Sequence, residues 1–417
     1  MEQTVILQLA RQAKQATLDA ANLTTQQKNA FLKKAAELLR ENISSIVAEN
    51  QKDLAAGKQK GLSSAMLDRL MLDDKRINEM AKALEEIIHL PDPVGDVVKE
   101  WARPNGLKVK RVRIPLGVIL IIYESRPNVT VDAAALCFKS GNVVILRGGS
   151  EAYHSNQKLV NILKQSLQTQ KLNPDMIQFV PTTDRESLYY LMTLASEIDL
   201  IIPRGGPSLM QMIREHAKIP VIRHDKGVCH LYVDGEADLA KAEKICINSK
   251  VQRPGVCNAL ETLLVDEKLK DSFLPKLLTK LQGLGVELRG DQEVQKVGKN
   301  IKPATDTDWD TEYLDLILSV KVVKGLEGAL DHIHRYSSLH TEAIVTENKA
   351  KADRFIRELN SSAIMWNAST RFNDGGQLGL GAEIGISTTK LHAFGPMGLE
   401  ELTTTKFVVI GEGQIRE

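Results

Sequence analysis

The sequence predicts an α/β protein with two parallel-sheet domains and a β-hairpin arm. Three observations predict this class. Short apolar runs alternate with helical segments from Val118 onward, the alternation starts again after Asp234, and a basic segment with an Asn-Gly turn precedes the first run. Alternation of this kind is typical of parallel sheets, because right-handed crossovers place helices on both faces.

The first ninety residues are predicted to be helical. Thr24 and Gln27 have the spacing of a capping box, in which each side chain bonds the other residue's backbone. Further along, one helical face carries Ile77, Met80, Ala81, Leu84, Ile87 and Ile88. We expect these helices to pack against a larger body.

Five apolar runs are predicted as strands of the first sheet. They are residues 117–123 (GVILIIY), 141–147 (GNVVILR), 177–181 (IQFVP), 198–204 (IDLIIPR) and 219–225 (IPVIRHD). Residues 155–170 and 208–217 are predicted as connecting helices. Ligands of such sheets bind beyond the carboxyl ends of the strands.

The second domain is predicted from a similar alternation. Helices are expected at 236–250 and 269–281, and strands at 260–265 (LETLLV) and 314–323 (LDLILSVKVV), with further units to about Trp366. The Gly-rich residues 375–385 are predicted as a loop or a domain-closing segment.

The arm is predicted from residues 101–115 (WARPNGLKVKRVRIP), where Asn105-Gly106 favours a hairpin turn. Its basic side chains are Lys108, Lys110, Arg111 and Arg113. The arm can serve as a nucleic-acid contact, as a solvated edge protected by charge, or as part of an intersubunit sheet. Residues 403–413 (TTTKFVVIGEG) also read as an extended segment with no sequence neighbour to pair with. Two such segments favour a homo-oligomer.

Composition excludes several classes of function. The 54 basic and 53 acidic residues leave a net charge of +1, so no global field attracts nucleic acid or membrane. No apolar run approaches the length that spans a bilayer, and no secretory signal is recognisable, so we expect a cytoplasmic protein with small-molecule ligands. The cysteines Cys137, Cys229, Cys246 and Cys257 lack paired spacing, which predicts free thiols without zinc or disulfides.

Cys257 is the candidate nucleophile. It lies in residues 252–260 (QRPGVCNAL), where Arg253, Gly255 and Asn258 are polar or turn-forming neighbours. Such a setting favours an exposed, electropositive thiol, whereas a structural cysteine usually lies in an apolar run.

Two strand ends are candidate phosphate sites. Gly205 and Gly206 follow the run 198–204 and precede a helix, so free N–H groups and the helix dipole suit a phosphate. Arg147 and Ser150 lie at the end of the run 141–147, where a guanidinium can hold a ribose phosphate. Both patterns are also found in ordinary tight turns.

Three histidines, His332, His334 and His340, suggest a metal at first sight. However, His332 and His334 are two residues apart at a helix end and point in different directions. No carboxylate or cysteine completes a familiar spacing. The sequence therefore predicts no metal, and the histidines are interpreted as site-lining or helix-terminal residues.

In order, the motifs are the helical region, PLGVILIIYESRP (115–127), the segment with the lone cysteine and the C-terminal strand. This order resembles the aldehyde dehydrogenase superfamily from end to end. Residues 251–265 (VQRPGVCNALETLLV) and 323–344 (VKGLEGALDHIHRYSSLHTEAI) are similar to the active-cysteine segment and the signature of its γ-glutamyl phosphate reductase family.

The resemblance implies an aldehyde dehydrogenase-like fold. Its Rossmann-type cofactor domain comprises residues 1–95 and 117–235, its catalytic domain 236–385, and its oligomerisation arm and C-terminal strand 96–116 and 400–417. It implies NADPH-dependent reduction of L-glutamyl 5-phosphate to L-glutamate 5-semialdehyde and phosphate through a cysteine thioester, in proline biosynthesis. The implied partners are the small substrate, NADP(H), a homo-oligomer and, transiently, glutamate 5-kinase.

Residue roles are implied in the same way. Cys257 becomes the nucleophile, Ser125 takes the place of an oxyanion-donating asparagine, and Glu312 matches a glutamate that holds the nicotinamide ribose. Arg147 replaces a lysine that contacts the adenosine ribose, which favours NADPH over NADH. Arg253 and Asn258 are expected to meet the substrate. Lys250, Asn248 and Asn367 are further substrate candidates from their nearness to matched segments.

One departure concerns water. Hydrolytic members of the superfamily carry a water-activating glutamate where this chain has His224, within RHDKG (223–227). The resemblance therefore implies a thioester that is reduced and not hydrolysed, unless Asp225 or a shifted alignment supplies the base.

Overall fold

The structure, a computed structural model, describes residues 2–416 and divides into two compact units. The first unit contains the described residues up to Arg223, together with Leu380–Gly385 and the residues from Met397 onward. The second unit contains His224–Gly379 and Ile386–Pro396. Each unit has its own parallel sheet.

The sheet of the first unit has four parallel strands in the order β5-β4-β3-β6. They are β3 (Val118–Tyr123), β4 (Val143–Gly148), β5 (Ile177–Phe179) and β6 (Leu200–Arg204). The helices between and after them are α6 (Asn128–Lys139), α7 (Tyr153–Thr169), α8 (Arg185–Leu191) and α9 (Pro207–His216), with short turns η1 (Ser150–Ala152) and η2 (Pro174–Met176). Four of the five predicted strands are thus confirmed, as are both connecting helices.

The fifth predicted strand, residues 219–225, is wrong. Only an isolated bridge joins Val221 to Ile201 of β6. Pro220 has no N–H to contribute to a ladder, and the first unit ends at Arg223. An apolar run in this place therefore marks the passage between units and not a strand.

The N-terminal helices are confirmed. They are α1 (Glu2–Ala20), α2 (Thr25–Glu41), α3 (Ile43–Gln59), α4 (Ser64–Leu70) and α5 (Asp74–Ile88). The capping box of Thr24 and Gln27 is present at the start of α2. The helix α2 contacts α5, α6 and α7, and the Phe31 ring lies 4.2 Å from that of Phe138. These helices therefore cover the helices of the sheet, as expected.

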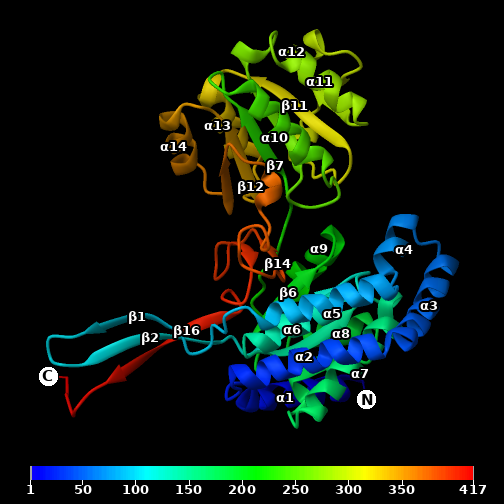
Figure 1. Ribbon diagram of the computed structural model, residues 1–417, viewed down its shortest axis with the longest axis vertical. Coiled ribbons are helices and arrows are strands. Elements are labelled where there is room, and N and C mark those ends of the chain that lie inside the picture. The colour runs from blue at the N-terminus through cyan, green and yellow to red at the C-terminus, as the bar shows by residue number, and fades with distance from the viewer. Residues whose placement is uncertain (1, 417) are drawn as a thin grey trace. The chain divides into compact units, whose positions relative to one another are not determined.

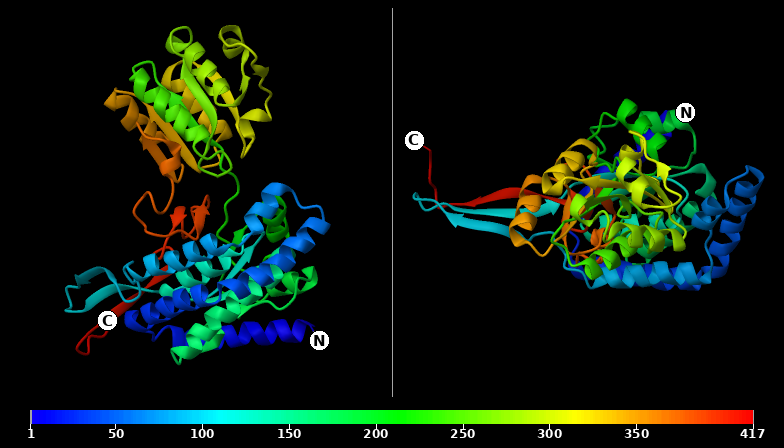
Figure 2. Two further views of the ribbon diagram at one scale, coloured as in Figure 1. Left: turned by 45° about the vertical axis from the view of Figure 1, so that its right-hand side comes forward. Right: turned by 90° about the horizontal axis from the view of Figure 1, so that it is seen from above.

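The arm is a three-stranded antiparallel sheet in the order β1-β2-β16, which extends from the body of the first unit (Figures 1 and 2). Its strands are β1 (Val97–Ala102), β2 (Lys108–Pro115) and β16 (Thr403–Ile410). Gly106 has φ +88° in the turn, so the predicted hairpin is confirmed. The expectation that the C-terminal segment lacks a partner is wrong, because it pairs with β2 of the same chain over its full length. The strands β2 and β16 lie too far apart in the sequence for local patterns to predict that they pair.

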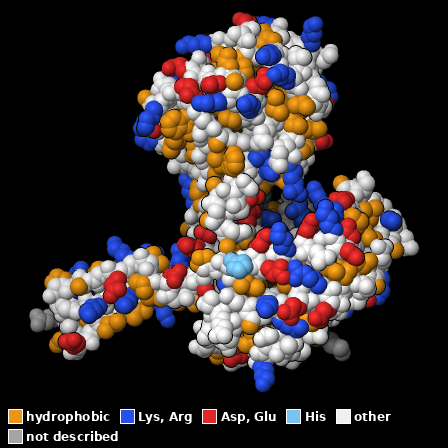
Figure 3. Space-filling view, viewed as in Figure 1, with side chains coloured by type: hydrophobic (Ala, Val, Ile, Leu, Met, Phe, Trp, Pro, Cys, Tyr) orange, Lys and Arg blue, Asp and Glu red, His pale blue; other side chains and the backbone are white. Residues whose placement is uncertain are grey.

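The arm carries charged and apolar side chains side by side (Figure 3). Its exposed large apolar side chains are Val97, Val98, Phe407, Val409 and Ile410. Both outer strands, β1 and β16, have one edge without a partner in the described chain.

The second unit is built on a seven-stranded parallel sheet in the order β10-β9-β11-β8-β7-β12-β13. Its strands are β7 (Cys229–Val233), β8 (Leu260–Asp266), β9 (Glu287–Gly290), β10 (Lys302–Pro303), β11 (Ile317–Val323), β12 (Thr341–Val345) and β13 (Ala363–Trp366). Its helices are α10 (Leu239–Val251), α11 (Leu274–Gly283), α12 (Gln292–Val297), α13 (Gly325–Tyr336) and α14 (Lys349–Glu358), with η3 (Glu267–Leu269), η4 (Asp308–Asp310) and η5 (Thr370–Phe372). A separate two-stranded sheet pairs β14 (Gly385–Ser387) with β15 (Gly395–Met397).

The predicted domain limit at residue 235 differs from the structure. The strand β7 pairs with β8 and β12, so residues 229–233 belong to the sheet of the second unit. The predicted strands at 260–265 and 314–323 correspond to β8 and β11, and the predicted loop at 375–385 has no helix or strand before Gly385.

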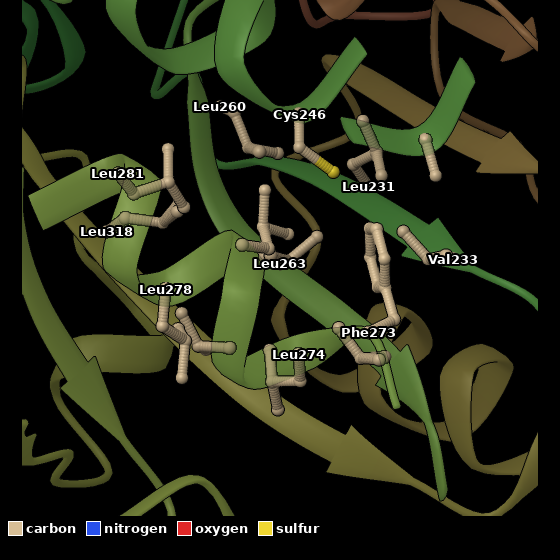
Figure 4. Close-up of a cluster of buried hydrophobic side chains, with 14 of the residues drawn as sticks. Leu231, Val233, Cys246, Leu260, Leu263, Phe273, Leu274, Leu278, Leu281 and Leu318 are labelled. Atoms are coloured by element: carbon tan, nitrogen blue, oxygen red, sulfur yellow. The ribbon is translucent and has the colours of Figure 1, made fainter. Parts of the chain in front are cut away.

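A leucine-rich core fixes the strands of the second unit. Leu274, Leu278 and Leu281 of α11 lie among Leu263 of β8 and Leu318 of β11 (Figure 4). Because each fully buried leucine contributes roughly 1.5–3 kcal/mol, this layer holds the ends of α10 and β8 firmly. Within residues 2–416, no helix combines the length and the apolar character that crossing a bilayer needs.

Candidate active site

Cys257 lies in the turn between α10 and β8, and its side chain is partly exposed. The other three cysteines, Cys137, Cys229 and Cys246, are fully buried. Burial raises the pKa of each of these three thiols. Since the thiolate is the reactive form, Cys257 is the thiol of the described chain best placed to react.

Close backbone contacts hold the Cys257 turn. Nδ2 of Asn258 donates to the carbonyl oxygen of Asn373 at 2.9 Å, and Sγ of Cys229 donates to the Cys257 carbonyl at 3.1 Å. A Cβ at Gly227 would lie 2.2 Å from that carbonyl and 2.8 Å from Oε1 of Glu312. The turn therefore requires glycine at 227, a residue that sequence reasoning did not single out.

Two histidines accompany the cysteine. Ligand atoms of His224, Cys257 and His340 all lie within 4.8 Å of one another. Burial, and then the charge of His224, lower the pKa of His340 to about 3, so its imidazole is neutral at neutral pH. Nε2 of His224 lies 4.0 Å from Oε1 of Glu312. The signature segment thus places His340 close to Cys257.

Glu312 is largely buried in the segment before β11. Burial raises its pKa, while a hydrogen bond from the Gly227 backbone and the charge of Lys226 act in the opposite direction. The predicted residues Cys257, Asn258 and Glu312 are therefore brought together in the second unit around Gly227.

Two arginines provide positive charge. Arg253 is exposed, whereas Arg371 of η5 is half-buried and its Nε donates to Oε1 of Gln252 at 2.8 Å. Burial, and then the charge of Arg253, lower the pKa of Arg371, while the charge of Asp374 and then that of a Cys257 thiolate oppose this. Arg371 is thus within electrostatic reach of both residues. Sequence reasoning missed it because more than a hundred residues separate it from Cys257.

Lys250 is not placed to hold a substrate. It is fully buried, and its Nζ donates to Oε2 of Glu261 at 2.7 Å. Burial lowers the pKa of Lys250 and raises that of Glu261 to about 7. Asn367 also has a structural role, since its amide bonds both backbone groups of Thr346. Asn248 is exposed on α10.

Apart from Glu312, the predicted cofactor residues lie at the carboxyl end of the first unit's sheet. Strand β3 lies between β4 and β6, so their carboxyl ends are neighbours. Arg147 is the last residue but one of β4, and its guanidinium donates to the carbonyl oxygens of Gly148 at 3.1 Å and Thr183 at 2.9 Å. Its Nε is buried without a hydrogen-bond partner within residues 2–416. Burial is the main cause that lowers the Arg147 pKa.

Carboxylates contact the other predicted donors. The Gly206 N–H at the start of α9 donates to Oε2 of Glu124 at 2.9 Å. Ser125 has φ +36°, and its N–H and Oγ both donate to Oε1 of Glu151, at 2.6 and 2.8 Å. A Cβ at Gly205 would lie 2.6 Å from Glu124, which explains the glycine. Ser150 is exposed at the start of η1.

His332 lies in a different cluster from Cys257. Its ring packs against those of His230, Trp309 and Tyr336, and Nζ of Lys321 donates to its Nδ1 at 3.2 Å. His230 in turn bonds the buried Glu342 at 2.9 Å. His334 bonds the Glu358 carbonyl at 3.3 Å. Neither His332 nor His334 belongs to the cysteine site.

Acid should destabilise the protein through His332. Burial, and then the charges of His230, Lys321 and Arg335, lower its pKa to about 2. The folded state binds no proton here, whereas the unfolded residue titrates near 6.5, so this stability is present above pH 6.5 and is lost as pH falls. We expect a loss of about 1.4 kcal/mol at pH 5.5 and about 2 kcal/mol at pH 5. Urea unfolding of His332→Gln should show a shallower pH dependence. An unchanged slope would contradict the assignment, and His334→Gln is the matched control.

A Rossmann-like parallel sheet, a second α/β unit with one accessible cysteine and a three-stranded arm define a protein of the aldehyde dehydrogenase type. The chain belongs to the aldehyde dehydrogenase family, whose family model matches residues 2–304.

Particular relatives are closely similar along the whole chain. The γ-glutamyl phosphate reductase of Geobacter metallireducens is 57% identical over 409 residues, which cover 98% of each chain. That of Desulfotalea psychrophila is 55% identical over 416 residues, covering 100% of this chain and 99% of the relative. The crystal structure of γ-glutamyl phosphate reductase from Thermotoga maritima has a TM-score of 0.97 and 47% identity, covering 99% of this chain and 100% of that one. This protein is accordingly an oxidoreductase. An acetylating aldehyde dehydrogenase from Geobacillus thermoglucosidasius, 16% identical with a TM-score of 0.70 over 100% of this chain and 98% of that one, shares the fold.

Proposed function

We propose that the protein reduces L-glutamyl 5-phosphate to L-glutamate 5-semialdehyde and phosphate with NADPH, as a step of proline biosynthesis in the cytoplasm. The observation that carries this proposal is the accessible thiol of Cys257, the one such thiol among the described residues. Its turn carries Arg253, and Arg371 bonds the adjoining Gln252. The names of relatives at 55–57% identity support the substrate.

The chemistry follows from the thiol. The Cys257 thiolate attacks the acyl carbon, the carbon–oxygen bond to phosphate breaks, and phosphate leaves as an enzyme thioester forms. NADPH, when bound, would supply the hydride for reduction of the thioester that Cys257 holds. The resulting thiohemiacetal collapses to the aldehyde, and the electrons of the carbon–sulfur bond return to Cys257. The backbone N–H of Cys257 stabilises the oxyanion. Ser125 stays a proposed helper, a role for which Glu151 must release the Oγ that now donates to it.

The surrounding charges suit an anionic substrate. Arg253 and Arg371 favour the thiolate over the thiol and attract the phosphate group. Asn258 uses Nδ2 to hold the turn, and its buried Oδ1 has no partner within the described residues. We propose that this amide oxygen accepts a hydrogen bond from the substrate.

The site has no glutamate at the position where hydrolytic relatives activate water. His224 occupies this position, next to Cys257, while the backbone of Asp225 donates to Oγ1 of Thr388 at 3.2 Å. A thioester that awaits reduction gains from the absence of an activated water. We propose that hydrolysis is correspondingly slow.

Most of the proposed cofactor residues lie at the carboxyl end of the first unit's sheet, and Glu312 lies in the second unit. The unsatisfied Nε of Arg147 suits an added anion, which supports NADP(H). Ser150 and Glu312 are proposed for the riboses, and Gly205 and Gly206 for the pyrophosphate. For the last role, Glu124 must release the Gly206 N–H to which it is now bonded.

Arg147→Met tests the choice of cofactor. A hydrogen bond to a charged group contributes about 1.5–3 kcal/mol, so we expect KM for NADPH to rise by at least about tenfold and KM for NADH to change little. Steady-state kinetics with each cofactor measures this. The exposed Arg69→Met is the charge-matched control. Equal losses with both cofactors would remove Arg147 from 2′-phosphate recognition.

We also propose a homo-oligomer that uses the arm, because the exposed apolar residues of β1 and β16 flank open strand edges. A transient contact with glutamate 5-kinase would deliver the unstable acyl phosphate.

Phosphate dependence tests the proposed function. Run in reverse, oxidation of glutamate 5-semialdehyde by NADP⁺ should require inorganic phosphate, because phosphate must cleave the thioester. Sulfate at the same ionic strength should not replace it. NADPH formation at full rate without phosphate, with glutamate as product, would indicate a hydrolytic aldehyde dehydrogenase instead.

A further inference from the structure

The three side chains around Cys257 include the ligand types that bind zinc. His224, Cys257 and His340 each offer a ligand atom, and these atoms lie within 4.8 Å of one another. They come from separate places in the sequence: the passage into β7, the turn before β8 and the residue before β12. The fold therefore assembles a cluster that none of the sequence spacings indicates.

The distances between these ligand atoms are close to those between the ligand atoms of a bound metal ion. Tetrahedral zinc, with bonds of about 2.3 Å to sulfur and 2.0–2.1 Å to nitrogen, places its ligand atoms about 3.3–3.6 Å apart. Closing the cluster to that geometry therefore needs side-chain shifts of about 1 Å. One cysteine and two histidines leave a fourth position for water.

An independent observation at His340 points to a ligand. The side chain is fully buried, and its Nδ1 is 2.7 Å from Oγ1 of Thr341. Its Nε2 is buried and has no hydrogen-bond partner in the part of the chain that the structure describes. A buried ring nitrogen without a partner costs free energy that a bound cation would recover.

The contacts around His224 and His340 also suit metal ligands. Metal-bound histidines commonly use their second nitrogen to bond a carboxylate or another polar group. Glu312 lies 4.0 Å from Nε2 of His224, and Thr341 provides the equivalent contact for His340. The ring of His340 packs edge to face against that of His224, with centroids 5.2 Å apart. The two imidazoles are thus oriented before any ion arrives.

We propose that His224, Cys257 and His340 bind one Zn²⁺ ion, and that the bound ion reversibly blocks the Cys257 sulfur. The inhibition rests on the proposed function, because it requires Cys257 to be the nucleophile, whereas the binding does not. Zinc on the sulfur occupies the lone pair that attacks the acyl carbon. The site would make the enzyme sensitive to free zinc and would protect the thiol from oxidation.

Metal binding is measured first, on the full-length protein without substrate. Titration with Zn²⁺ alone, followed by calorimetry, should give one ion per chain, and Co²⁺ in its place should give a thiolate-to-cobalt charge-transfer band. His224→Asn, His340→Asn and Cys257→Ser should each weaken binding by more than about 100-fold, since even outer partners of metal ligands contribute 10–100-fold. Glu312→Gln should lie in that lower range. His334→Asn, which removes an exposed histidine, should bind zinc normally.

Activity is measured second. Zinc should inhibit wild-type reductase with the affinity found by calorimetry, and EDTA should restore the rate. Binding that is unaffected by all three ligand substitutions, or cobalt without a thiolate band, would overturn the site. Zinc bound by Cys257 in an enzyme that stays fully active would overturn the inhibition. A protein that binds zinc as expected but lacks phosphate-dependent turnover would instead contradict the proposed function and leave the metal site standing.

Discussion

Cys257→Ser should lose reductase activity by several orders of magnitude and keep its fold. A covalent nucleophile acts with the rest of its site as a unit, so its loss removes most of the catalysed rate. Serine is isosteric with cysteine, and Cys257 is partly exposed, so little packing changes. Steady-state reduction of glutamyl phosphate measures the loss, and urea unfolding measures stability.

The matched control is Cys246→Ala. Cys246 lies in the leucine-rich core of the second unit, fully buried (Figure 4). Its replacement should lower stability modestly and leave turnover per folded molecule unchanged. Retained activity in Cys257→Ser would transfer the nucleophilic role to another cysteine, and the structure offers only buried ones among the described residues. Iodoacetamide should likewise label Cys257 first.

The elements that were predicted well have local signals. Apolar runs such as residues 117–123 are strands because a parallel strand is covered on both faces, and all six residues of β3 are buried. The run 219–225 (IPVIRHD) begins with apolar residues but forms no strand, because Pro220 lacks an N–H, the last three residues are charged or polar, and the unit ends at Arg223. Pairing of β16 with β2 joins residues nearly three hundred positions apart, and no local pattern encodes it.

The residues of the candidate site also fall into two groups, those with a local sequence signal and those without one. Cys257 was recognisable because its neighbours form a turn and carry charge within a few residues. Gly227, Arg371 and His340 reach it only through the order of β7, β8 and β12 in the sheet. The carboxylates of Glu124 and Glu151 at the predicted cofactor edge were also invisible, since nothing in the sequence indicates which backbone donors they contact.

Lys250→Met should destabilise the second unit strongly. The change leaves Glu261 fully buried without its cation, and breaking one side of a buried ion pair typically costs about 3–5 kcal/mol. Burial already raises the pKa of Glu261 to about 7, and loss of the nearby positive charge raises it further. In the variant, folding therefore favours the protonated acid. Stability relative to wild type should fall as pH rises above about 7, because there Glu261 ionises in the folded wild-type protein and stays protonated in the folded variant.

Replacing Glu261 as well tests whether its unpaired buried carboxylate causes the loss of stability. The substitution Glu261→Gln keeps a side-chain oxygen for the Leu314 N–H, which in the wild-type protein donates to Oε1 of Glu261 at 3.2 Å. The double variant K250M/E261Q should therefore recover much of the stability lost by K250M and lose its pH dependence, since replacing both partners of a buried pair is often neutral. Denaturant midpoints at pH 6 and 8 measure both effects. The exposed pair Lys349–Asp353 is the control, and Lys349→Met should change the midpoint little because solvent screens such pairs. If K250M and K349M behaved alike, the ion pair would not hold the strand that follows Cys257.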